Sequence, residues 1–230
     1  MYPFIILCGG FATRLGSIAS SDPKCLLDVN NKPFLYYQLS LLNKIRPMDV
    51  YLSVGHLSDK FDKFLDNFKF ENLNLKLIHD GSVPLGTGGA IKNILKKLDT
   101  PAFVMYGDSF LRVNFLEIFH AYKNKSEGPL LVIYKNNGKY DVSNVSFDGT
   151  SITYSKSNPD SLADHIDYGV GIYKYSDFNG TQKSFDLSVV QEKFSKQKKL
   201  QHFLANKKFI EIGTPESYKE AEKYFSKHEN

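Results

Sequence analysis

The N-terminal segment constrains the fold most, because an almost uninterrupted apolar run ends there in two glycines. Residues Phe4–Cys8 are apolar, and Gly9 and Gly10 follow directly. A run of this kind is typical of a strand that is buried on both faces, as in a parallel sheet. A glycine pair after such a strand lets the backbone approach a phosphate closely and point successive N–H groups at it. The segment therefore predicts a buried strand of an α/β fold, followed by either a phosphate-binding loop or a plain strand-loop connection.

The rest of the first 110 residues alternates between helix-like and strand-like segments. This alternation is typical of a mostly parallel sheet flanked by helices, with ligand-binding loops at the carboxyl ends of the strands. Apolar spacing predicts helices at Phe34–Ile45, Asp59–Phe68 and Ala90–Leu98, and strands at Asp49–Val54, Leu75–Ile78 and Ala102–Tyr106. The second half is richer in short strands, which we expect at Leu130–Tyr134, Val142–Phe147, Ile152–Tyr154 and Gly169–Tyr173, before a final helix at Pro215–Lys227.

Composition argues against several classes of protein. The 230 residues carry a net charge of only +4, and the lysine-rich run Lys193–Lys199 is typical of a solvated helix face, so we expect no nucleic-acid partner. No run approaches the roughly 18 apolar residues of a membrane span, so we expect no membrane association. Two cysteines are too few for a disulfide framework and favour the reducing cytoplasm.

Three polar motifs lie next to these predicted elements. Thr13, Arg14 and Lys24 follow the first glycine pair and supply a hydroxyl and two cations that suit phosphate oxygens. Residues 84–90 place three glycines before a predicted helix, which suits either a base or phosphate or a plain helix start. Asp108 follows a buried strand, where a carboxylate is well placed to hold Mg²⁺ or, alternatively, to cap a helix.

Taken in order, these motifs resemble the sugar-phosphate nucleotidyltransferase family. The match runs from Leu7 to Tyr218 and is densest at the N-terminus, where glycine pair, threonine, arginine and lysine follow one another as in that family. Two positions depart from the pattern: Ala12 replaces a glycine and Cys25 replaces a proline. Neither change removes a charge. The resemblance implies a Rossmann-like, mostly parallel sheet of the GT-A-like type with a small β-rich acceptor-binding subregion.

The resemblance also implies roles for individual residues. Arg14 and Lys24 would act in catalysis by neutralising the triphosphate, and Asp108 and Glu211 would hold Mg²⁺, Glu211 being one methylene longer than the family's aspartate. The implied nucleotide-binding residues are Leu7, Gly9, Gly10, Thr13, Gly81, Ser82, Gly86 and Thr87, and the implied acceptor-binding residues are Lys156, Asp167, Gly169 and Asp186.

The function implied is transfer of NMP from an NTP to a sugar 1-phosphate, with release of pyrophosphate, in surface polysaccharide synthesis. The short chain and the loop at residues 84–90 favour GTP and a heptose 1-phosphate. Two alternatives remain open: a cytidylyl- or uridylyltransferase for another phosphorylated acceptor, and a nucleotide-sugar sensor without catalysis. We expect one domain over residues 1–230, with mainly nucleotide binding in 1–110 and mainly acceptor binding in 111–230, in a monomer or homodimer.

Overall fold

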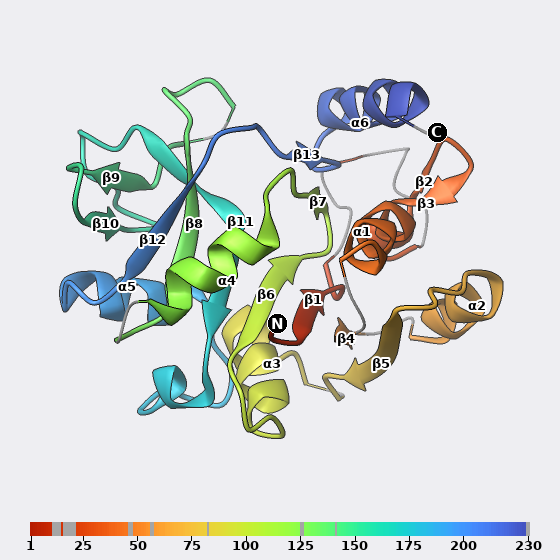
Figure 1. Ribbon diagram of the computed structural model, residues 1–230, viewed down its shortest axis with the longest axis horizontal. Helices are drawn as coiled ribbons and strands as arrows, with labels where there is room; N and C mark the ends of the chain where they lie inside the picture. Colours follow the sequence, from red (N-terminus) through yellow and green to blue (C-terminus); the bar gives the residue numbers. More distant parts are fainter. Residues whose placement is uncertain are drawn as a thin grey trace. The chain divides into compact units, whose positions relative to one another are not determined.

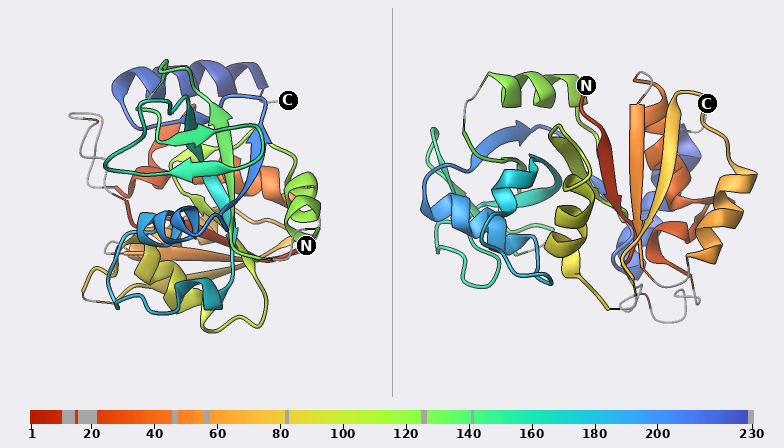
Figure 2. Two further views of the ribbon diagram at one scale, coloured as in Figure 1. Left: turned by 90° about the vertical axis from the view of Figure 1, so that its left-hand side faces the viewer. Right: turned by 90° about the horizontal axis from the view of Figure 1, so that it is seen from below.

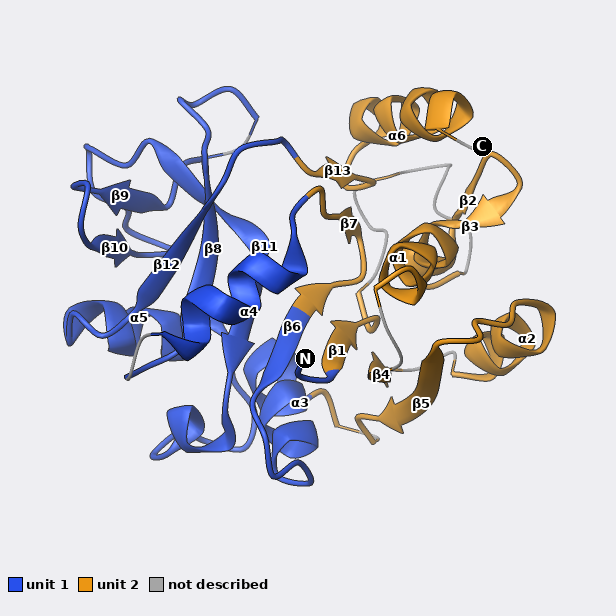
Figure 3. Ribbon diagram, viewed as in Figure 1, with its two compact units in different colours: residues 1–3, 85–104, 113–208 blue, residues 4–84, 105–112, 209–230 orange. Residues whose placement is uncertain are grey.

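The computed structural model divides the chain into two compact units, which Figure 3 distinguishes by colour. Unit 1 comprises residues 1–3, 85–104 and 113–208, and unit 2 comprises residues 4–84, 105–112 and 209–230. The structure describes residues 1–10, 15, 22–45, 48–55, 58–81, 83–124, 127–140 and 142–228. The expected functional division at residue 110 concerns ligand binding and stays a prediction.

Unit 2 contains a parallel sheet of the kind that the sequence predicts. Strand β1 (Phe4–Leu7) pairs in parallel with β4 (Met48–Val54), which pairs in parallel with β5 (Leu73–His79). The right-hand view of Figure 2 shows the three strands side by side. The first three residues of β1, Phe4, Ile5 and Ile6, are fully buried, which explains the apolar run in the sequence. Because the three strands are parallel, their carboxyl ends lie at the same edge of this sheet.

The helices of unit 2 follow the apolar spacing of the sequence closely. Helix α1 (Phe34–Asn43) begins directly after Pro33, and α2 (Asp59–Asn67) and α6 (Pro215–His228) start at the predicted residues. The side chains of Tyr37 and Phe225 stack with ring centroids 3.8 Å apart and join α1 to α6. Four short strands complete the unit: β2 (Asp28–Val29), β3 (Lys32–Pro33), β7 (Ser109–Phe110) and β13 (Ile210–Glu211).

Unit 1 is built on a mixed sheet. Strand β8 (Leu130–Lys135) pairs antiparallel with β11 (His165–Tyr173) and parallel with β12 (Gln201–Ala205), and β9 (Val145–Phe147) pairs antiparallel with β10 (Ile152–Tyr154). Leu131, Ile133 and Leu200 are among the buried residues of its core. Its helices are α3 (Gly86–Leu95), α4 (Phe115–Lys123) and α5 (Ser188–Lys196), which Figure 1 labels. Strand β6 (Ala102–Tyr106) contributes residues 102–104 to this unit and 105–106 to unit 2 (Figure 3).

The start of α3 corrects a sequence prediction. We expected a glycine-rich loop followed by a helix from Ala90, but the helix already begins at Gly86. The glycines lie against the backbone around Phe185, whose carbonyl oxygen accepts hydrogen bonds from the N–H groups of Gly88 and Gly89 at 2.9 and 3.3 Å. This contact satisfies amides of the first turn that have no partner within the helix. Helix propensity alone predicts the wrong start because the glycines are used for packing here.

We expect Gly89→Ala to destabilise the protein, although alanine is normally the better helix former. A β-carbon at this position would lie 2.5 Å from the carbonyl oxygen of Lys183, so α3 and that segment must separate. We predict a loss of about 1–3 kcal/mol in the free energy of unfolding, measured by urea denaturation. Lys96→Ala, at the exposed end of the same helix, is the control and should change stability by no more than about 0.5 kcal/mol. An equal effect of both substitutions would contradict the packing role of Gly89.

Candidate nucleotide and metal site

Residues that follow β1, β4 and β5 lie close together in unit 2: Gly9, Gly55 and Asp80. Gly9 and Gly10 are exposed after β1, as expected of a phosphate-binding loop. A β-carbon on Gly9 would lie 3.5 Å from the backbone nitrogen of Gly55 and 3.9 Å from Oδ2 of Asp80. The absence of a side chain at Gly9 therefore leaves bare backbone next to the carboxylate of Asp80. This is a surface on which a flat, polar ligand group can lie.

Asp80 is a candidate site residue that the sequence reasoning missed. It directly follows β5, and the hydroxyl of Ser53 donates a hydrogen bond of 3.0 Å to its Oδ1. Burial raises the pKa of Asp80, and the hydrogen bond from Ser53 acts in the opposite direction. The position after a strand is the same signal that identified Asp108. The sequence pattern assigned a nucleotide role to Gly81 and Ser82, which follow Asp80, but not to Asp80 itself.

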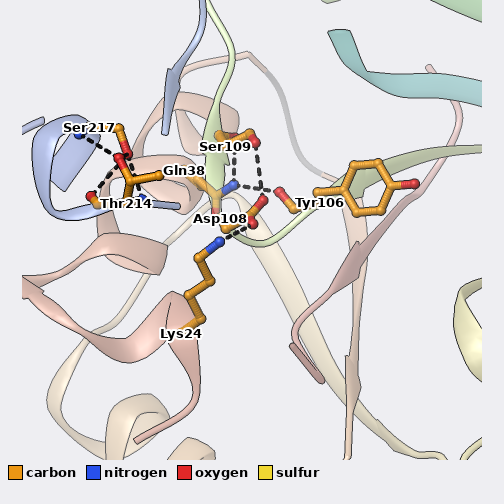
Figure 4. A network of polar contacts seen from close by, with 7 residues as sticks. All are labelled: Lys24, Gln38, Tyr106, Asp108, Ser109, Thr214 and Ser217. Carbon is orange, nitrogen blue, oxygen red and sulfur yellow. Dashed lines mark hydrogen bonds and ion pairs between the residues drawn. The ribbon is translucent and has the colours of Figure 1, made fainter. Parts of the chain in front are cut away.

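An ion pair between Lys24 and Asp108 forms the second part of the site (Figure 4). The Lys24 Nζ lies 2.6 Å from Oδ2 of Asp108, and the Ser109 hydroxyl donates a hydrogen bond of 3.1 Å to Oδ1. Lys24 starts a 3₁₀ turn, and Asp108 lies between β6 and β7. The Lys24 side chain is 9% exposed and that of Asp108 is 31% exposed, so the carboxylate remains accessible to a ligand. Two residues predicted for different roles are thus in direct contact.

Backbone hydrogen bonds fix the position of Asp108. The N–H of Gly107 donates to the carbonyl oxygen of Leu7 at 3.0 Å, and a β-carbon on Gly107 would lie only 2.7 Å from that oxygen. The Gln38 amide donates to the carbonyl oxygens of Tyr106 and Ser109 at 2.9 and 2.8 Å. These contacts attach the strand end to β1 and α1. The carboxylate is therefore held on rigid elements, as a ligand-binding group requires.

Glu211 lies on the strand that pairs with the segment of Asp108. It is opposite Ser109 in the antiparallel pair of β13 and β7, and the N–H of Ile212 donates to the carbonyl oxygen of Asp108 at 3.2 Å. A β-carbon on Gly213 would lie 2.8 Å from Oε2 of Glu211 and 3.6 Å from Nζ of Lys24. The Glu211 carboxylate and the Lys24 ammonium therefore both lie around the α-carbon of Gly213.

The donor set of this site fits Mg²⁺. Mg²⁺ prefers hard oxygen ligands and is usually held by one or two carboxylates together with substrate phosphates. Asp108 and Glu211 supply two carboxylates from neighbouring segments. Within the described ranges, no group of three or more His, Cys, Asp or Glu side chains is placed to hold a metal. A metal at this site would therefore need phosphate or water oxygens to complete its coordination.

The residues after Glu211 have a structural role of their own. Thr214 precedes α6, its hydroxyl accepts a hydrogen bond of 3.2 Å from the N–H of Ser217, and its own N–H donates to the Ser217 hydroxyl at 2.9 Å (Figure 4). Pro215 occupies the first position of the helix, where a missing N–H costs nothing. The residues after Glu211 thus connect the end of β13 to the start of the final helix.

The four predicted acceptor-binding residues belong to one polar cluster in unit 1. The Lys156 Nζ lies 2.8 Å from Oδ2 of Asp186. Oδ1 of Asp167 accepts a hydrogen bond of 2.8 Å from the N–H of Gly169, and Oδ2 accepts one of 2.9 Å from the amide of Gln191. Burial would raise the pKa of Asp186, but hydrogen bonds from Lys156 and Ser188 outweigh burial and lower it.

Burial raises the pKa of Asp167 to about 6, although two hydrogen bonds act in the opposite direction. The folded state therefore binds this proton more tightly than the unfolded state, where the pKa is near 3.8. The stability contributed by protonation is complete below the unfolded pKa and is lost as the pH rises through about 6.

We expect this loss to be visible in the difference between the wild type and Asp167→Asn, which cannot titrate. Between about pH 4 and pH 7, the unfolding free energy of the wild type should fall relative to the variant by on the order of 2 kcal/mol. Urea denaturation at a series of pH values measures both proteins. The subtraction removes the titration of other groups, such as Asp177, whose pKa burial also raises to about 6. A pH-independent difference would show that Asp167 ionises normally.

The other predicted nucleotide residues are placed as follows. Leu7 ends β1, and Gly81 follows Asp80 with a positive φ of 85°. In unit 1, Gly86 starts α3, and the Thr87 hydroxyl accepts a hydrogen bond of 2.8 Å from the N–H of Leu187. The predicted contacts of all four residues with a nucleotide stay predictions. Ala12, Thr13, Arg14 and Ser82 lie outside the described residues.

Comparison with known proteins gives relatives that match almost the whole chain. A D-glycero-alpha-D-manno-heptose 1-phosphate guanylyltransferase of Campylobacter jejuni is 32% identical and covers 93% of this chain and 96% of its own length. An enzyme of the same name from Aneurinibacillus thermoaerophilus is 29% identical, over 95% of this chain and 96% of its own length. More distant matches include mannose-1-phosphate guanylyltransferases.

Solved structures confirm the predicted fold. The crystal structure of HddC from Yersinia pseudotuberculosis has a TM-score of 0.82 at 24% identity and covers 98% of this chain and all of its own. A second structure of HddC is a complex with GMP-PN, with a TM-score of 0.78. A glucose-1-phosphate thymidylyltransferase of Bacillus anthracis has a TM-score of 0.79 at 17% identity, over 97% of this chain and 95% of that one. The expected Rossmann-like α/β architecture is therefore correct.

The family of this chain is shown by a protein-family sequence model that matches more than half of its residues. Residues 4–171 match the MobA-like NTP transferase domain, a range that begins at β1 and includes the glycine pair, Lys24 and Asp108. The described helices include none that is long and apolar enough to cross a membrane. The resemblance inferred from the order of the motifs is confirmed: the chain belongs to the MobA-like NTP transferase domain family and is a nucleotidyltransferase.

Proposed function

We propose that this enzyme transfers GMP from GTP to a heptose 1-phosphate and releases pyrophosphate. Two relatives that match over nine tenths of the chain carry the name of that activity, which supports both the base and the acceptor. The observation in this chain that carries the choice of base is the carboxylate of Asp80, next to the bare backbone of Gly9.

Asp80 favours guanine on chemical grounds. A carboxylate with two acceptor oxygens matches two adjacent donors, and guanine offers these in its N1–H and 2-amino groups. Uracil places carbonyl oxygens on both sides of its single N–H, where a carboxylate repels them. Cytosine and adenine each combine an amino group with a ring acceptor. Among the four common bases, guanine is therefore the best partner for an ionised Asp80.

The residues of unit 2 would have separate roles in binding the triphosphate. We infer that the glycine pair after β1 accommodates phosphate oxygens with its backbone and that Lys24, together with Arg14, neutralises their charge. Asp108 and Glu211 would hold Mg²⁺, which supplies Lewis-acid polarisation of the phosphate oxygens. Two carboxylates alone would repel a triphosphate, so the cations are required for binding as well as for turnover.

The acceptor completes the reaction. An oxygen of its phosphate forms a bond to the α-phosphorus of GTP while the bond from that phosphorus to the bridging β-phosphate oxygen breaks, and pyrophosphate takes the electron pair. The attacking phosphate is already anionic at neutral pH, so no general base is needed, and catalysis depends on alignment and charge neutralisation. In unit 1, Lys156 would bind the acceptor phosphate, and Asp167, Gly169 and Asp186 would contact the sugar.

A cytoplasmic enzyme of surface polysaccharide synthesis is consistent with this activity. Cys8 and Cys25 are both buried free thiols, as expected in a reducing compartment. A nucleotide-activated heptose is a glycosyl donor, so a glycosyltransferase must consume the product.

Pyrophosphate release from a matrix of four NTPs and several phosphorylated acceptors tests the proposal. We expect GTP with a heptose 1-phosphate to give the highest kcat/KM, with mannose 1-phosphate as the nearest competitor. A higher value for UTP or CTP would overturn the choice of base. Nucleotide binding without release for every acceptor would instead favour the alternative of a sensor.

A further inference from the structure

The amino group of Lys24 contacts a carboxylate oxygen of Asp108 that the proposed metal would bind. Its Nζ is 2.6 Å from Oδ2 of Asp108, and it lies near the α-carbon of Gly213, where the carboxylate of Glu211 also lies. A metal ion that binds Asp108 through this oxygen cannot do so while the ammonium group remains in contact with it. Lysine and metal therefore compete for one carboxylate.

The burial of the pair makes this competition strong. The Lys24 side chain is 9% exposed, and among the described residues Asp108 is the one carboxylate paired with it. An ammonium group in such a place loses most of its hydration, so it does not leave the carboxylate unless another anion receives it. The phosphates of a nucleotide are anions that can do this.

We propose that Lys24 closes the metal site of the free enzyme and that the nucleotide opens it. The triphosphate offers its oxygens to the Lys24 ammonium, which leaves Asp108, and Asp108 and Glu211 then hold the metal that accompanies the nucleotide. Lys24 thus couples the binding of metal to the binding of nucleotide. This inference rests on the proposed function, because it takes Asp108 and Glu211 as the metal ligands.

The proposal has a consequence for the free protein. Removing a nearby positive charge favours a cation by Coulomb's law alone, and in this site the ammonium group also contacts an oxygen that the metal would need. Here, Lys24→Met should increase the affinity for a divalent cation in the absence of nucleotide, because it frees the carboxylate of Asp108. In the wild type, metal binding without nucleotide should be weak.

Titration with Mn²⁺, followed by electron paramagnetic resonance, tests this without measuring turnover. We expect Lys24→Met to bind Mn²⁺ about tenfold or more tightly than the wild type when nucleotide is absent. The double variant Lys24→Met/Asp108→Asn should lose that gain. Lys76→Met removes a lysine paired with Asp49 at 2.8 Å on the surface of the same unit and is the matched control, with no expected gain. Thermal unfolding with and without Mn²⁺ gives a second readout, because only Lys24→Met should gain stability from the metal.

Two other outcomes would overturn the proposal in different ways. If Lys24→Met shows no gain, while Asp108→Asn weakens Mn²⁺ binding in the presence of GTP, the metal site is correct and the competition by Lys24 is wrong. If Asp108→Asn binds Mn²⁺ and GTP as the wild type does, the assignment of the metal ligands in the proposed function fails, and the inference fails with it.

Discussion

Replacing Asp108 by asparagine is expected to lower kcat/KM for pyrophosphate release on the order of 10³-fold or more. The substitution keeps the shape of the side chain and its carbonyl oxygen but removes the negative charge that would hold Mg²⁺. Hydrogen bonds from Gln38 and from the N–H of Gly107 fix this segment without using the carboxylate, so only its contacts with Lys24 and with the Ser109 hydroxyl change. The fold should therefore persist.

Some stability should nevertheless be lost, because Lys24 remains without its partner at 9% exposure. We expect about 1–3 kcal/mol, measured by urea denaturation, which still leaves a folded protein under assay conditions. Asp49→Asn is the control, because it breaks an ion pair with Lys76 at 2.8 Å, at the other end of β4 from the nucleotide loops. That variant should retain wild-type kcat/KM. Near-normal pyrophosphate release by Asp108→Asn would contradict the assignment of Asp108 as a ligand of Mg²⁺.

The parallel sheet of unit 2 was predictable because its signals are local. The apolar run of β1 reflects burial on both faces of the strand, and the apolar spacing of α1 and α2 reflects burial on one face of each helix. The structure places these elements within a few residues of the predicted bounds. The contact of Lys24 with Asp108 joins residues 84 positions apart, and no local pattern encodes it. The order of the motifs placed both residues in one site without predicting that they touch.

Unit 1 was predicted less well, because its elements depend on packing partners far along the chain. Strand β12 pairs with β8, about seventy residues earlier, and carries a histidine and a glutamine that obscure its periodicity. Helix α5 has lysines in its last turn, where they suit the helix dipole; the lysine run indicated a helix face, but not that the helix begins at Ser188. The early start of α3 follows from the contact with Phe185, which becomes visible only in the folded chain.

The choice of base should change when Asp80 is replaced by asparagine. The ionised carboxylate can accept hydrogen bonds from N1–H and the 2-amino group of guanine, whereas asparagine offers one acceptor and one donor. The new amino group would then face the 2-amino group of guanine, donor against donor. Hydrogen bonds to a charged group contribute roughly 1.5–3 kcal/mol, so kcat/KM for GTP should fall on the order of 10²-fold.

Xanthosine triphosphate separates recognition of guanine from general damage to the site. Xanthine keeps N1–H but carries an oxygen in place of the 2-amino group, so it complements the acceptor and donor of asparagine. We therefore expect Asp80→Asn to prefer XTP over GTP, while the wild type prefers GTP, in an assay of pyrophosphate release with the same acceptor. Asp49→Asn, on the adjacent strand, should leave both values unchanged. An equal fall for all nucleotides, or an unchanged preference for GTP, would show that the carboxylate beside Gly9 does not contact the base. A reversal of preference would place the guanine edge at Asp80, because no loss of stability converts the rejection of XTP into its selection.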